Sequence, residues 1–81
     1  MDVDLGRYVS NPLWPILVET VHAMVMYPHH KAYTANSILS QQPDITPRDL
    51  ATKLAIPLGE ALVILHELRR GEDSSLDDVS V

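Results

Sequence analysis

The sequence contains no cysteine and only three glycines among its 81 residues. These absences exclude disulfide bonds, thiolate metal sites and a glycine-rich phosphate loop. No serine or threonine lies in a recognisable local context with a histidine and an acid, as nucleophilic catalysis would require. A secretory signal pattern is also missing. We therefore expect a protein that is not an enzyme, needs no cofactor and is intracellular, most simply cytoplasmic.

Positive charge is also scarce, because six Lys and Arg residues stand against eleven Asp and Glu, for a net charge of −5. Proteins that bind nucleic acids gain affinity by neutralising phosphates with such cations, so the composition disfavours nucleic acid as a partner. Four of the acidic residues lie in 72–81, where polar residues predominate. We expect residues 1–71 to form a single helical domain and residues 72–81 a flexible acidic tail.

No hydrophobic run is long enough to cross a membrane. The best candidate, residues 12–27, falls short of the ~20 apolar residues that a spanning helix needs, and it contains Glu19. Asn11 can cap a helix that has Pro12 at its first position, and Pro28 would end it. This helix has apolar residues on two sides, so it is either the central helix of the fold or presents one side to another chain.

Two further helices are predicted after residue 45. Thr46 can act as an N-cap, Pro47 suits the first helical position, and Asp49 favours the positive end of the helix dipole. The pattern breaks at Ile56–Pro57, because a residue before proline is pushed out of the α region. A further helix then runs to Arg70 and is capped by Gly71.

Residues 45–70, with residues 31–41 as a preceding helix, resemble the trihelical helix-turn-helix core of the winged-helix superfamily. A wing cannot follow, since residues 72–81 are too few and too polar to form a β-hairpin. Residues 50–57 also loosely resemble ubiquitin-associated three-helix modules. We expect an all-α fold: a small bundle of about four helices containing a helix-turn-helix-like unit at about 31–70, preceded by a helix at about 12–27.

The resemblance leaves two classes of function open. In helix-turn-helix readers, the second helix presents base-reading side chains to the major groove. Here the outward positions are expected to offer two carboxylates and two aliphatic groups instead of Arg, Asn or Gln. These positions are Gly59, Glu60, Val63, Ile64 and Glu67. A nucleic-acid-binding regulator therefore remains the alternative, with phosphate contacts from Arg48, Lys53, Arg69 and Arg70.

The class that we favour is a non-catalytic protein–protein interaction module or accessory subunit of a larger assembly. A bundle of this size cannot cover every apolar face, so some apolar surface should remain for a protein partner or for a second copy in a homodimer. Aromatic and methionine side chains are enriched in such interfaces. The predicted protein-binding residues are Trp14, Val18, Met26, Val63 and Ile64.

The four histidines do not predict a metal site. His29 and His30 are adjacent and would point in different directions on a turn, whereas zinc needs three or four converging ligands. His22 and His66 are expected on polar helix faces, exposed to solvent. No metal is therefore expected.

Overall fold

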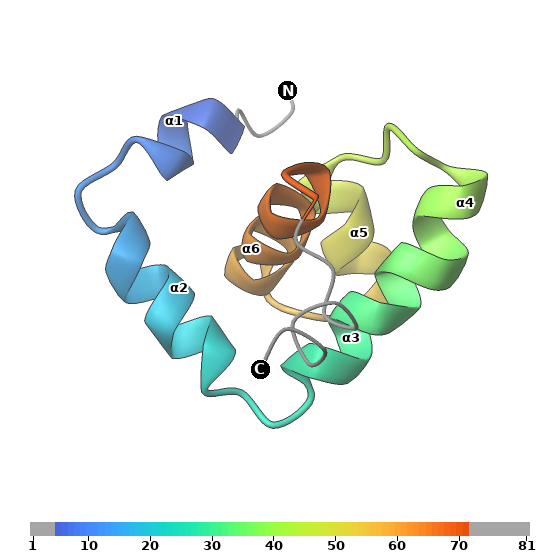
Figure 1. Ribbon diagram of the computed structural model, residues 1–81, viewed down its shortest axis with the longest axis horizontal. Coiled ribbons are helices and arrows are strands. Elements are labelled where there is room, and N and C mark those ends of the chain that lie inside the picture. Colours follow the sequence, from blue (N-terminus) through green and yellow to red (C-terminus); the bar gives the residue numbers. More distant parts are fainter. Residues whose placement is uncertain (1–4, 72–81) are drawn as a thin grey trace.

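A computed structural model describes residues 5–71, and these residues are helical with short connections and no strand (Figure 1). An all-α fold is therefore confirmed for the part of the chain described. A π-helical segment, η1, joins α3 to α4 without interruption, so residues 27–41 form one continuous helix. The elements are α1 (Leu5–Val9), α2 (Trp14–His22), α3 (Tyr27–Tyr33), η1 (Thr34–Ile38), α4 (Leu39–Gln41), α5 (Pro47–Leu54) and α6 (Leu58–Arg69).

The centre of the fold is α6, which packs against α2, α3 and α5. Figure 1 shows α1 and α2 along one side of α6 and the continuous helix of residues 27–41 along another. Every residue from Glu60 to Leu65 is buried, so this part of α6 has no solvent-exposed face. The other elements and their connections contribute the rest of the core beside it: Val21, Tyr27, Ile38, Ile45, Leu50 and Ile56.

The predicted turn between α5 and α6 is present. The Thr46 hydroxyl accepts a hydrogen bond from the Asp49 backbone N–H at 3.1 Å, which caps α5 as expected. Ala55, with φ 56°, then adopts the left-handed conformation that ends α5. Pro57 precedes α6 in extended conformation, and Gly71 takes a positive φ after it.

The predicted helix at 12–27 is wrong in its bounds. In the structure α2 ends at His22, and Ala23–Met26 form a turn into α3. Pro28 lies in the first turn of α3, where its missing N–H costs nothing, so it helps to start a helix instead of ending one. The short helix α1 was not predicted.

The expected outward positions of α6 are also wrong. Val63 and Ile64 have no exposed surface, and Glu60 and Glu67 are exposed by only 1% and 6%. The reason is that α2 and α3 cover the side of α6 that the helix-turn-helix resemblance left open. The predicted acidic tail at 72–81 lies outside the described residues. Within residues 5–71, no helix has the length and apolar character needed to span a membrane.

Candidate functional site

Two buried carboxylates distinguish the interior of this small fold. Glu60 and Glu67 are separated by seven residues, about two helical turns, and therefore lie on the same side of α6. A buried carboxylate is tolerated only where hydrogen bonds or opposite charges replace its lost hydration. The residues that meet these two side chains come from α2 and α3.

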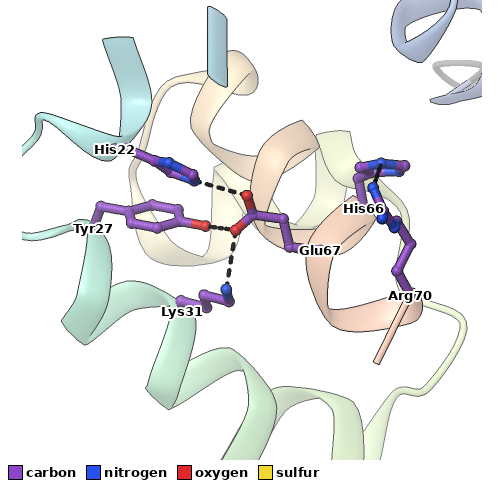
Figure 2. Close-up of polar contacts among 6 residues, drawn as sticks. All are labelled: His22, Tyr27, Lys31, His66, Glu67 and Arg70. Atoms are coloured by element: carbon purple, nitrogen blue, oxygen red, sulfur yellow. Dashed lines mark hydrogen bonds and ion pairs between the residues drawn. The ribbon is translucent and has the colours of Figure 1, made fainter. Parts of the chain in front are cut away.

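Glu67 is surrounded by three donors, which we call the Glu67 cluster (Figure 2). His22 Nε2 lies 2.7 Å from Oε2, and Lys31 Nζ donates to Oε1 at 3.0 Å. The Tyr27 hydroxyl also donates to Oε1. The cluster therefore ties the end of α2 and the first two turns of α3 to the C-terminal half of α6.

The local charge favours an ionised Glu67. Burial alone would raise its pKa, but the hydrogen bonds from Tyr27, Lys31 and His22 outweigh that effect and lower the pKa below the ordinary value of 4.5. The Lys31 side chain is 6% exposed, so its ion pair with Glu67 is shielded from solvent. Lys31 also lies 5.8 Å from the centre of the Tyr27 ring, within the range of a cation–π contact.

Glu60 forms a second contact near the start of α6. Its Oε2 lies 2.5 Å from Nδ1 of His30 in α3, while its Oε1 is buried without a hydrogen-bond partner. The His30 side chain is 28% exposed, so this pair reaches towards the surface. The pair fastens the middle of α3 to the first turn of α6.

This polar interior holds α2, α3 and α6 together, and most of it is buried. Of the groups in contact with Glu67, only the His22 side chain is substantially exposed, at 47%. Among the described residues, no group of three or more His, Cys, Asp or Glu side chains could hold a metal ion. The chemistry that this arrangement supports is charge pairing inside the fold.

The histidines differ in part from their expected positions. His22 is exposed, as expected, but it pairs with Glu67. His29 and His30 lie on α3 instead of in a loop, because Pro28 starts that helix. His66 is half-buried: its ring packs edge-on against Trp14, with centroids 5.4 Å apart, and its Nε2 lies 3.4 Å from Arg70 Nη1 (Figure 2).

Apolar side chains are exposed on α1 and α2. Tyr8, Leu13 and Ile16 are exposed by 43%, 65% and 58%. Together with the neighbouring Trp14 and Leu17 they form what we call the α1–α2 surface. No charged residue occurs between positions 8 and 18. A hollow of about 160 Å³ opens on this surface, lined by Tyr8, Asn11, Leu13, Trp14 and Leu17.

The predicted protein-binding residues do not form one surface. Val63 and Ile64 lie in the core, whereas Trp14 and Val18 are half-buried and pack against it. Met26 is 51% exposed, in the turn before α3. Trp14 alone among the five lines the hollow. The exposed residues Tyr8, Leu13 and Ile16 were missed, because an amphipathic analysis assigns large aliphatic side chains to the inside.

The predicted phosphate-contacting residues are also dispersed. Arg48 and Lys53 are exposed on α5. Arg69 Nη2 instead donates to the backbone carbonyls of Pro43 and Ile45, at 3.2 and 2.7 Å, and so secures the connection before α5. Arg70 is exposed beside His66.

Comparison of the chain with protein-family models, curated proteins and solved structures finds no match.

Proposed function

We propose that this protein is a non-catalytic interaction module, an accessory subunit that docks on protein through the α1–α2 surface. The observation that carries the proposal is the exposure of Leu13 and Ile16 on a helix whose opposite side already packs on α6. Large apolar side chains exposed together, without charge between them, favour protein contact.

The size of the hollow supports binding of a side chain over catalysis. Small-molecule sites usually enclose about 300–1,000 Å³. The hollow of about 160 Å³ is closer to the apolar cavity of roughly 150 Å³ that accepts a single benzene-sized group. A protruding aliphatic or aromatic side chain of a partner fits this dimension.

The position of α6 argues against the alternative, a nucleic-acid-binding regulator. A recognition helix must expose its N-terminal half to enter the major groove. Here Glu60 to Leu65 are all buried. Of the four predicted phosphate-contacting residues, Arg69 is already bonded to backbone carbonyls, and the exposed ones are divided between α5 (Arg48 and Lys53) and the end of α6 (Arg70).

Site-specific photocrosslinking in the cells of origin tests the proposal. A photoreactive residue at Ile16 should give discrete protein adducts, whereas the same residue at Asp49, exposed on α5, should not. Adducts at Asp49 alone would contradict the proposal. Fluorescence anisotropy with duplex DNA at low salt tests the alternative. Binding that weakens as salt is added and that is lost in the Arg48→Ala, Lys53→Ala double variant would support a nucleic-acid-binding regulator instead.

A further inference from the structure

The outer face of α2 has an unusual composition for a solvent-exposed helix face. Leu13, Ile16, Thr20 and Ala23 are all exposed, and they follow one another at intervals of three, four and three residues. These intervals place them in a single row along the helix. The backbone stays helical across the row, because Leu13 and Ala23 have right-handed conformations and the Ala23 N–H bonds to the Glu19 carbonyl at 3.2 Å.

The one polar residue of the row is satisfied within its own helix. The Thr20 hydroxyl donates to the Ile16 carbonyl at 2.9 Å, so covering Thr20 would leave no hydroxyl proton without an acceptor. The row thus offers two large side chains at one end and two small ones at the other, with no charge. We call it the α2 row.

The large side chains at one end of the α2 row and the small ones at the other fit a second copy of the same row. We propose that the α2 row pairs with the α2 row of a second copy of this chain, antiparallel and about a twofold axis level with Val18. In that register Leu13 faces Ala23 of the second copy and Ile16 faces Thr20, so each large side chain meets a small one at both ends. A twofold contact requires one patch to be complementary to itself, and this order of residues meets that requirement. The inference rests on the proposed function, because it names the partner of the same α1–α2 surface.

The Glu19 side chains of the two copies would lie near each other in this dimer. Glu19 is exposed beside the α2 row, and the twofold axis places the Glu19 side chains of both copies along the same edge. Exposed like charges repel weakly, and salt screens them. The pair should therefore tighten when salt is added, in contrast to an interface held by ion pairs.

The length of the row limits the affinity. Stable complexes bury about 800 Å² on each partner, and a contact between two helices of about three turns supplies only part of that area. We expect sedimentation equilibrium of the full chain to show a monomer–dimer equilibrium with a dissociation constant in the range of about 1 to 100 μM.

Two variants test the register. Ile16→Glu should raise the dissociation constant at least ~10-fold, as expected for a central apolar contact. Its matched control is Val25→Glu, because Val25 is 87% exposed but lies in the turn after α2. Mixing the Ile16→Glu and Thr20→Lys chains should restore dimers, since the carboxylate introduced in one chain then faces the ammonium group introduced in the other. Glu19→Gln should lower the dissociation constant below that of the wild-type chain, because it removes the repulsion between the two Glu19 side chains.

Three results would overturn the inference: a monomer up to about 1 mM, dissociation caused by Val25→Glu instead of Ile16→Glu, or no recovery on mixing two variants that both keep the helical circular dichroism of the wild type. If Ile16→Glu itself fails to fold, the dissociation constants of the other two variants test the inference. The inference predicts a lower constant for Glu19→Gln and a higher one for Thr20→Lys than for the wild type, and unchanged constants would overturn it. A monomeric chain that still gives adducts with a different protein at Ile16 would refute the homodimer and retain the proposed function.

Discussion

At the residue scale, the stability of this fold depends on how Glu67 is neutralised. Three side chains from two other helices meet one carboxylate that is 6% exposed. Such a group is not by itself a source of stability, because desolvation offsets much of the attraction. Removing its cation is a different matter, since two hydrogen-bond partners then remain but no positive charge of Lys31 balances the buried carboxylate.

We expect Lys31→Met to lower the free energy of unfolding by about 3 kcal/mol, because it leaves Glu67 buried without its cation. Chemical denaturation monitored by circular dichroism measures the change. The matched control is Lys53→Met on the exposed side of α5, which should change stability by no more than about 0.5 kcal/mol. Equal effects of the two substitutions would contradict the role given to the Glu67 cluster.

The lowered pKa of Glu67 also predicts how stability depends on acid. Since the folded-state pKa lies below the ordinary value of 4.5, the ionised group stabilises the fold at pH values above 4.5, and this contribution disappears as the pH falls through the folded-state pKa. The difference in unfolding free energy between wild type and Glu67→Gln should be constant above about pH 5.5 and shrink below pH 4.5. Denaturation at a series of pH values measures it; a difference that grows on acidification would refute the assignment.

At the scale of the elements, local signals determined what could be predicted. Thr46 and Pro47 specify the start of α5 by interactions within one turn, and the predicted start is correct. Pro28 was ambiguous, because proline is compatible both with the residue after a helix and with the first turn of one. The choice between them depends on tertiary contacts, which a sequence pattern does not contain.

The candidate site was harder to predict than the helices. Glu60 and Glu67 contact residues 30 to 45 positions away, and no local pattern brings those residues together. A signal for the burial of α6 was nevertheless present, since Ala61 to Leu65 form an uninterrupted apolar run. A helix that is apolar on all sides is typically buried, and that rule would have placed Val63 and Ile64 in the core.

The cap of α5 allows a quantitative test at this scale. Thr46→Ala removes the acceptor for the Asp49 N–H and should lower the free energy of unfolding by about 1 kcal/mol. Thr52→Ala, on an exposed position inside the same helix, removes no cap and should leave stability within about 0.5 kcal/mol of wild type. Thermal or chemical denaturation of both variants compares them. Equal losses would mean that the hydroxyl of Thr46 does not cap α5.

At the scale of the whole molecule, burial is unevenly distributed. α6 contributes seven buried residues to the described part of the chain, whereas α1 contributes none. Regions with few buried contacts open at little cost in free energy, while the most buried helix opens only with global unfolding. Stability should therefore vary strongly along the chain.

Amide hydrogen exchange measures this distribution directly. We expect the α6 amides to exchange with the free energy of global unfolding and the α1 amides to exchange with an opening free energy near zero. The N–H groups of α2 should lie between these limits, because Val21 is its one buried residue. Protection of α1 as strong as that of α6 would contradict this view of the fold, unless it appears only at concentrations where a dimer forms.

The central position of α6 also has a consequence for the order of events during synthesis. Ribosomes make chains from the N-terminus, so α2 and α3 emerge before the helix that carries the acceptors for His22, Tyr27, His30 and Lys31. Until α6 follows, these donors have water as their partner and the apolar sides of α2 and α3 have no helix to cover them. Folding of residues 5–71 must therefore be completed after translation of residue 67. In a shorter nascent chain the apolar sides of α2 and α3 stay uncovered, and they are prone to aggregation unless another molecule covers them.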